Sequence, residues 1–429
     1  MTTVLPTPAV DSRERTASGS ARLPLRGAEP GAGSLEAEPG AGSLEAEPAT
    51  PLGDPGLFGV YLHVPFCLTR CHYCDFVTYT GMEGLRRPYV AALLDEATMA
   101  VAALGPEPPV VTSVFVGGGT PTLLPSEELA RVLQRLRELL AFAPGAEVTV
   151  EANPETVEPA MAAGLAAAGV TRVSMGAQSF DDQVLAALGR VHDAARVAAA
   201  VATLRAAGVP AVNLDLIYGG PGEDAGSWAA TLEAAVALGP EHLSAYALTI
   251  EPATRFGRLV AAGRMPEPDE DDLADRYDRA CAVLAAAGYH HYEVSNWARG
   301  PARASRHNLT YWRRGRYLGL GAGAHEFDGT TRSWNVAGVP EYLAAVNAGR
   351  RPAHGQERLD PGQARFEALA LRLRTAGGLD PEEAATLGVD PAGTQAQELR
   401  EAGLLGPGPG LALTEKGMFL HGEVVARLA

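Results

Sequence analysis

From residue 59 onward, short runs of apolar and β-branched residues alternate along the chain with longer, alanine-rich segments. The short runs predict buried strands, and the longer segments have the length and composition of helices. Strands are expected at residues 60–64, 112–116, 147–151, 172–176, 212–217 and 242–249. Helices are expected at residues 87–103, 126–141 (with Ser126 as N-cap), 158–168, 227–238 and 271–287, and as a pair between 181 and 207. This strict alternation predicts a parallel sheet with right-handed crossovers.

Glycines and polar residues follow almost every predicted strand. A Gly-Gly-Gly-Thr-Pro sequence begins at Gly117, Glu151 ends the third strand, Gln178 follows the fourth and Asp215 lies in the fifth. Because the carboxyl ends of parallel strands meet at one edge of the sheet, we expect one shared site there. The glycine run lacks the spacing of a nucleotide-phosphate loop, which leaves a tight turn or a backbone that approaches another ligand. Glu151 and Asp215 are either solvated rim charges or partners of a ligand's ammonium and hydroxyl groups.

Three of the four cysteines, Cys67, Cys71 and Cys74, lie within eight residues, directly after the first predicted strand. Three thiolates at this spacing suit an iron–sulfur cluster, and the lack of a fourth leaves one iron open to a further ligand. With His72 they could instead form a Cys3His zinc site, but no second ligand pair follows. The sequence shows no secretory signal, which disfavours disulfides. The fourth cysteine, Cys281, is expected to pack as a small apolar residue in a helix.

A second candidate site is the sequence His307-Asn308-Leu-Thr-Tyr311-Trp312. Imidazole is a common axial ligand of haem iron, and flat aromatic rings could face a macrocycle. Three arginines nearby could pair with its propionates: Arg313, Arg314 and Arg316. The residue types alone, however, favour a histidine that is hydrogen-bonded in a loop, beside a Tyr–Trp core contact. Three rival histidines could also reach an iron: His290, His291 and His325.

The composition divides the 429 residues into four parts. Residues 1–56 are rich in Ala, Gly, Pro, Ser and Glu, and we expect them to be disordered. Residues 57–298 hold the strand–helix pairs, and 299–360 form a connecting region with the His307 motif. Residues 361–429 resemble a small winged-helix module, with helices expected at 364–374, 381–387 and 398–405, a glycine-rich turn at 406–410, a strand at 411–414 and a final helix.

The charge and the hydropathy of the sequence limit the classes of partner and the cellular compartment that we expect for the protein. A net charge of −16 without any basic block argues against nucleic acid. No apolar run reaches the length of a membrane span, which leaves only peripheral association with a membrane. The few cysteines, kept as thiolates, suit a reducing cytoplasm.

Several of these motifs, taken in order, resemble those of the oxygen-independent coproporphyrinogen III oxidase family of the radical S-adenosylmethionine (SAM) superfamily. The matching segments are 61–67, 117–122, 151–154, 172–180, 188–192, 213–219 and 242–246. The resemblance implies a partial (β/α)6 barrel with a small C-terminal domain, a [4Fe-4S] cluster on Cys67, Cys71 and Cys74, and SAM on the open iron. By position, Tyr61, Gly118 and Glu151 would contact that SAM. Further residues match the region where the oxidases hold a second SAM: Tyr73, Gly119, Thr120, Gln178, Arg190, Asp215 and Ala247.

Two features separate the branches of this family. Phe76 stands where the decarboxylating oxidases have a further cysteine, and the 307–312 motif is typical of the haem chaperone branch. The resemblance therefore implies that His307, Asn308, Tyr311 and Trp312 bind haem, and that haem passes to acceptor proteins, respiratory ones among the candidates. The alternatives are oxidative decarboxylation of coproporphyrinogen III to protoporphyrinogen IX and a radical reaction on another substrate, so no catalytic residue is assigned. Gly220 and Glu326 depart from the family pattern near the predicted barrel mouth.

Overall fold

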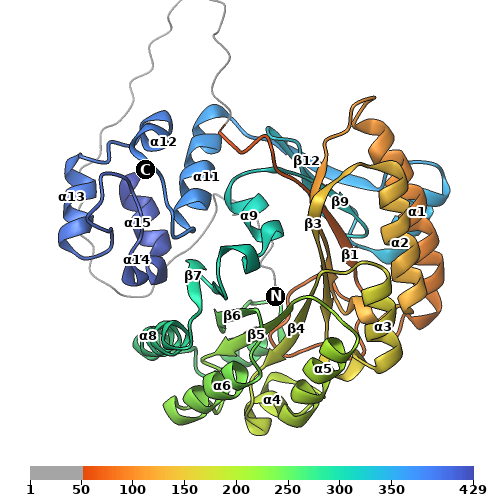
Figure 1. The fold of residues 1–429 in the computed structure, drawn as a ribbon, viewed down its shortest axis with the longest axis horizontal. Coiled ribbons are helices and arrows are strands. Elements are labelled where there is room, and N and C mark those ends of the chain that lie inside the picture. Colours follow the sequence, from red (N-terminus) through yellow and green to blue (C-terminus); the bar gives the residue numbers. More distant parts are fainter. Residues whose placement is uncertain (1–51) are drawn as a thin grey trace, which may run out of the picture. The chain divides into compact units, whose positions relative to one another are not determined.

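The computed structural model describes residues 52–429, so nearly all of the segment expected to be disordered, residues 1–56, lies outside the described part. Six parallel strands form the centre of one sheet, in their order along the chain (Figure 1). They are β1 (Phe58–Val64), β2 (Val111–Gly118), β3 (Phe142–Ala152), β4 (Arg172–Gln178), β5 (Val212–Tyr218) and β6 (His242–Ala247). The predicted parallel α/β fold is confirmed. Buried apolar side chains such as Val60, Val114 and Leu214 explain why the strands read as short apolar runs.

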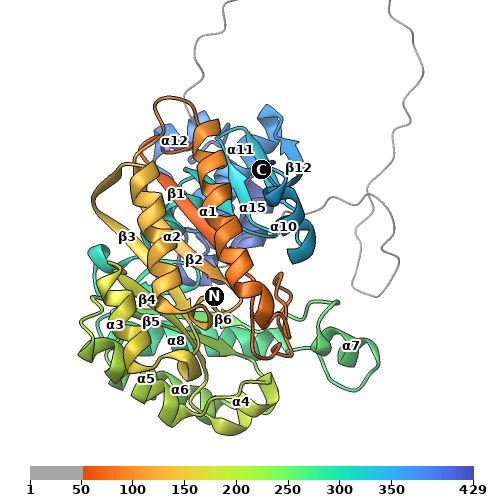
Figure 2. The ribbon, with the colours of Figure 1, turned by 90° about the vertical axis from the view of Figure 1, so that its right-hand side faces the viewer.

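Helices follow the strands and cover the outer face of the sheet (Figure 2). They are α1 (Arg86–Ala103), α2 (Ser126–Leu139), α3 (Pro159–Ala167), α4 (Asp182–Leu188), α5 (Ala194–Ala206), α6 (Ala225–Ala237) and α8 (Glu270–Ala286). In α1, buried Tyr89, Leu93 and Ala97 recur four residues apart, so they face the sheet together. The prediction of Ser126 as an N-cap is wrong by one position. Pro125 takes the cap position and offers no side-chain acceptor, and α2 begins at Ser126.

Further strands extend the sheet at both edges, so the described sheet has twelve strands of mixed direction. Beside β1 lies β9 (Arg316–Leu320), which is parallel to it, and then β10 (His325–Phe327), β11 (Thr331–Asn335) and β12 (Ala353–Arg358), which are antiparallel. Beyond β6 lie β8 (Asn296–Ala298) and β7 (His290–Glu293). The segment expected to connect two domains, 299–360, thus contributes four strands together with α9 (Arg306–Trp312) and α10 (Val339–Asn347).

The C-terminal segment is mostly helical. It contains α11 (Pro361–Leu373), α12 (Pro381–Thr386), α13 (Thr394–Glu401), α14 (Glu415–Phe419) and α15 (His421–Leu428). In place of the expected strand at 411–414, two isolated backbone bridges join Leu411 to Leu379 and Leu413 to Leu405. The expected final helix is interrupted at Leu420, between α14 and α15. Among the described residues, none of the helices has the length and apolarity needed to cross a bilayer.

Two histidines, one buried and one half-buried, make the stability of this fold depend on pH. Burial lowers the pKa of His63 in β1 and of His421 in α15 from 6.5 to about 4. Below pH 6.5 the unfolded chain therefore binds protons that the folded chain does not, so stability falls until pH reaches about 4. We expect each group to reduce the free energy of unfolding by about 2 kcal/mol between pH 7 and pH 5. Urea unfolding at both pH values measures this loss, which should be smaller in His421→Gln; an unchanged loss would contradict the expectation.

Candidate functional site

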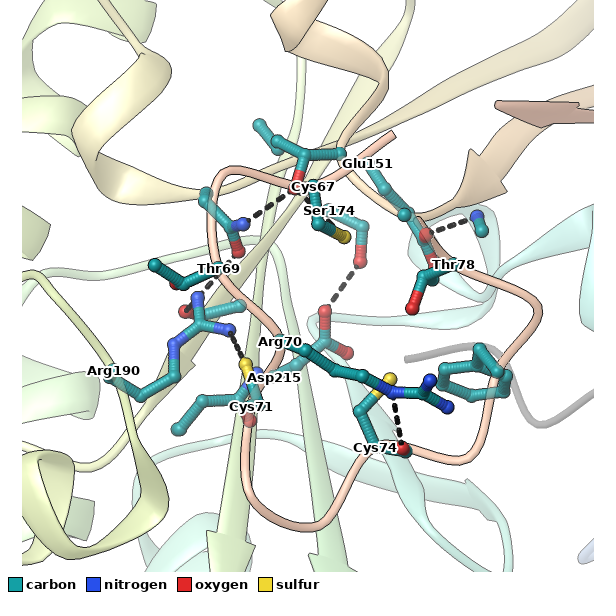
Figure 3. Close-up of a pocket in the computed structure, with 18 residues that line it drawn as sticks. Cys67, Thr69, Arg70, Cys71, Cys74, Thr78, Glu151, Ser174, Arg190 and Asp215 are labelled. Carbon is teal, nitrogen blue, oxygen red and sulfur yellow. Dashed lines mark hydrogen bonds between the residues drawn. The ribbon is translucent and has the colours of Figure 1, made fainter. Parts of the chain in front are cut away.

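The cysteine loop leaves the carboxyl end of β1 and folds back on itself. The backbone N–H of Cys67 donates to the Tyr79 carbonyl at 2.9 Å, and that of Tyr79 donates to the Pro65 carbonyl at 2.7 Å. Farther along the loop, the N–H of His72 donates to the Leu188 carbonyl at 3.1 Å. These bonds fix the loop at both ends. Its three cysteine side chains line an open cavity of about 590 Å³ (Figure 3).

A helix that the sequence analysis missed, α7 (Arg255–Ala261), supports the same loop. The N–H of Phe256 donates to the His72 carbonyl at 3.0 Å, and the Arg255 guanidinium lies 2.6 Å from His72 Nε2. The Phe256 ring packs in a small apolar cluster with Tyr73 and Leu188. The loop is therefore held between α7 on one side and the end of α4 on the other.

Burial changes the acidity of the cysteine thiols, and a cation lies beside one of them. Burial raises the pKa of the Cys67 thiol to about 11, and it also raises the pKa of Cys74. Both thiols are thus protonated at neutral pH unless a cation replaces the proton. The Arg190 guanidinium donates to Cys71 Sγ at 3.2 Å (Figure 3). Three sulfur donors around one cavity, with a cation beside one of them, fit an iron–sulfur cluster that keeps one iron free of protein ligands.

Arg190 connects the cysteine loop to the ends of two neighbouring strands. Its second guanidinium nitrogen donates to the Gly176 carbonyl at 3.1 Å and to Asn153 Oδ1. The Asn153 amide in turn donates to Thr120 Oγ1 at 2.8 Å, and the Thr120 hydroxyl lies 3.9 Å from Cys67 Sγ. This chain of contacts fixes the far wall of the cavity.

The glycine run is required by the closeness of its neighbours. Gly118 has φ +111° and a Cβ atom there would lie 2.5 Å from the His63 ring, while a Cβ on Gly119 would lie 2.5 Å from the Phe66 carbonyl. The Gly118 N–H donates to Glu151 Oε2 at 3.0 Å. Close protein neighbours thus require glycine at both positions, and both glycines line the cavity together with the cysteines.

Asp215 belongs to a polar network inside the sheet. Its carboxylate accepts from the Ser174 hydroxyl at 2.9 Å and from the Asn213 amide at 3.0 Å. Asn213 Oδ1 lies 2.6 Å from His242 Nδ1, and His242 Nε2 lies 2.8 Å from the Tyr292 hydroxyl. That hydroxyl accepts from the backbone N–H of Ser305, whose side chain caps α9. The network therefore runs from the cavity to the start of the helix that carries His307.

Most of the residues expected to contact SAM line the cavity together with the cysteines. They are Gly118, Gly119, Thr120, Glu151, Gln178, Arg190 and Asp215. Gln178 adopts φ +66°, and its Oε1 is buried without a protein partner, so it can accept a hydrogen bond from a ligand.

Three of the expected contacts lie outside this lining. The Tyr61 hydroxyl lies 2.9 Å from His63 Nδ1, Tyr73 packs in the apolar cluster that contains Phe256 of α7, and Ala247 ends β6. Several other residues of the lining were not predicted as site residues: Thr69, Arg70, Thr78, Ala152, Asn153 and Ser174. Ser174, Asn213 and His242 occupy polar positions within buried strands, and this is the signal that could have revealed the network.

The four residues of the expected haem motif lie on α9. His307 is completely buried, and its ring stacks on Phe115 at 5.2 Å. Its Nδ1 lies 3.0 Å from the Ser113 hydroxyl and its Nε2 lies 2.8 Å from the Tyr311 hydroxyl. Burial lowers the pKa of His307 to about 3, so its ring is neutral at physiological pH. Both nitrogens are engaged in this conformation.

The neighbours of His307 are also packed. Trp312 is 2 % exposed, and the Arg374 guanidinium covers its ring at 4.4 Å. Asn308 is buried, and its Oδ1 has no protein partner. Arg314, expected near propionates, instead forms an ion pair with Glu367 at 3.0 Å. Of the rival histidines, His290 is exposed, His325 stacks on Trp334, and His291 stacks on Trp297.

The parallel sheet and its three-cysteine loop define a radical SAM protein, and the Radical SAM superfamily pattern matches residues 61–235. The coproporphyrinogen III oxidase HemN of Escherichia coli has the same fold, with a TM-score of 0.74 at 23% identity over 89% of this chain and 91% of that chain. The chain is 45% identical to the heme chaperone HemW of Mycobacterium tuberculosis H37Rv over 389 residues. These aligned residues cover 88% of this chain and 98% of that relative. It is 34% identical to HemW of Bacillus subtilis over 85% of this chain and 97% of that relative. The chain belongs to the HemW family, which confirms the resemblance inferred from the motifs.

Proposed function

We propose that this protein is a cytoplasmic haem chaperone that binds a [4Fe-4S] cluster, SAM and haem and delivers haem to acceptor proteins. The observation that carries the proposal is the extent of the match to proteins named as heme chaperones, which spans 98% of the mycobacterial relative. Phe76 supports it, because this apolar residue lines the cavity where the decarboxylating branch carries a further cysteine.

Cys67, Cys71 and Cys74 would hold the cluster. When bound, the cluster supplies an iron that can chelate the amino acid end of SAM and an electron that can reach its sulfonium. The chain's own residues then orient the ligand. Glu151, which accepts from the Gly118 N–H, would pair with an ammonium group, and Asp215 would accept from ribose hydroxyls.

Haem would bind at His307, Asn308, Tyr311 and Trp312. For His307 to reach iron, one ring nitrogen must first lose its present partner. Tyr311 is half-buried, whereas Ser113 is fully buried, so we expect Tyr311 to move and to free Nε2. Because burial lowers the pKa of His307, its ring is neutral at physiological pH, and one of its two nitrogens carries no proton.

One anaerobic experiment distinguishes a haem chaperone from a coproporphyrinogen decarboxylase. The cluster-reconstituted protein is given reductant, SAM and either coproporphyrinogen III or haem, followed by a haem-free respiratory protein. We expect haem uptake and transfer, seen as a shift of the haem absorption band to that of the acceptor, and no protoporphyrinogen. Formation of protoporphyrinogen, or failure to take up haem, would overturn the proposal.

A further inference from the structure

A second group of metal-binding side chains lies away from the cysteine loop. Cys281 in α8, His291 in β7 and Glu415 at the start of α14 come from three separate elements. Their ligand atoms all lie within 4.8 Å of one another. The group connects α8 and the edge strand β7 of the sheet to α14 in the C-terminal segment. Cys281 is only 2 % exposed, as expected for a residue that packs as a small apolar side chain. Its thiol, however, also lies near the polar side chains of His291 and Glu415.

The hydrogen bonding of the His291 ring leaves one of its nitrogens able to bind a metal. It lies flat on Trp297, with ring centroids 4.2 Å apart and an interplanar angle of 8°. Its Nε2 lies 3.2 Å from the Val294 carbonyl, and a carbonyl can only accept, so Nε2 carries the proton. Nδ1 is consequently an unprotonated acceptor, and it is buried without a protein partner. Metal-bound histidines typically donate their other N–H to a backbone carbonyl or a carboxylate in this way.

The charges around Cys281 also favour a cation. Burial, together with the nearby carboxylates of Glu415 and Asp278, raises the pKa of its thiol to about 12. The backbone carbonyls of Val294 and Glu293 face the ring of His291. Two carboxylates thus lie near the Cys281 thiol, and a divalent cation bound there would balance their charge.

We propose that Cys281, His291 and Glu415 bind one zinc ion. One sulfur, one nitrogen and one oxygen donor suit zinc, whereas magnesium and calcium prefer oxygen alone. Tetrahedral zinc needs ligand atoms about 3.3–3.8 Å apart, so small side-chain rotations from the present arrangement suffice. Binding replaces the thiol proton, which is released to solvent. Glu415 is exposed, so water can take the fourth position, and the ion would fasten α14 to α8 and β7.

The test uses the full chain with its iron–sulfur cluster reconstituted anaerobically, so that iron already occupies Cys67, Cys71 and Cys74. After addition of one equivalent of Zn²⁺ and desalting, elemental analysis should find about one zinc per chain with unchanged iron. X-ray absorption at the zinc edge should detect a single sulfur neighbour. Zinc at the cysteine loop would instead show three sulfurs, and either that result or a lack of zinc would overturn the proposal.

Variants assign the ligands. Cys281→Ser and His291→Gln should each lower zinc affinity by more than about 10- to 100-fold. That range is the typical effect of losing a residue that only hydrogen-bonds to a metal ligand. His290→Gln, at the exposed neighbouring position, should retain zinc and serves as the matched control. Because Cys281 is buried and its variant could fail to fold, Glu415→Gln at the exposed start of α14 provides a second test, measured by competition with a chelator. Equal zinc affinity in Glu415→Gln and wild type, or zinc retained in Cys281→Ser, would contradict the assignment.

Discussion

Cys71→Ala is expected to abolish the iron–sulfur cluster. The wild type should hold about four irons per chain after anaerobic reconstitution, and the variant close to none, because only two thiolates would remain in the loop. Loss of Cys71 also removes the acceptor of the Arg190 guanidinium, which lies 3.2 Å from the sulfur. Iron analysis and the visible absorption of the reconstituted protein measure the effect.

The fourth cysteine supplies the control for this experiment. Cys281→Ala removes a thiol outside the cavity, and we expect it to keep its full iron content. Equal iron in Cys71→Ala and wild type would mean that the loop does not hold the cluster.

His307→Ala is expected to lower haem affinity at least about tenfold, since it removes the proposed axial ligand. His325→Ala, a rival histidine on β10, should bind haem as the wild type does. Titration with haem, followed by its absorption band, measures the affinities. Equal affinities in His307→Ala and wild type would remove His307 from the haem site.

Tyr311→Phe distinguishes a ligand from a merely structural histidine. It keeps the aromatic ring and deletes the hydroxyl that lies 2.8 Å from His307 Nε2. If that nitrogen must be freed to reach iron, haem uptake should become faster in this variant. A structural role for His307 predicts no acceleration, and slower uptake would contradict the proposed movement of Tyr311.

The centre of the fold could be predicted because buried parallel strands are continuous apolar runs. The edges could not. The strand β9 contains Arg316 and Tyr317, and β12 alternates exposed and half-buried residues, so neither resembles a core strand. Their pairing depends on contacts with strands far away in the sequence, such as β9 with β1.

The candidate site could also be predicted only in part. Motif residues at strand ends converge on one cavity because parallel strands end at the same edge. The burial of His307 was not visible, because residue types do not show which face of α9 packs against Ser113 and Phe115. Likewise, Cys281, His291 and Glu415 come together only in the folded chain.

The most direct test of this account is the electron paramagnetic resonance spectrum of the reduced cluster, recorded with and without SAM. Because the three cysteines would leave one iron of a [4Fe-4S] cluster without a protein ligand, we expect added SAM to change the spectrum. A spectrum unaffected by SAM, or anaerobically prepared protein that holds zinc in place of iron at the three cysteines, would contradict it.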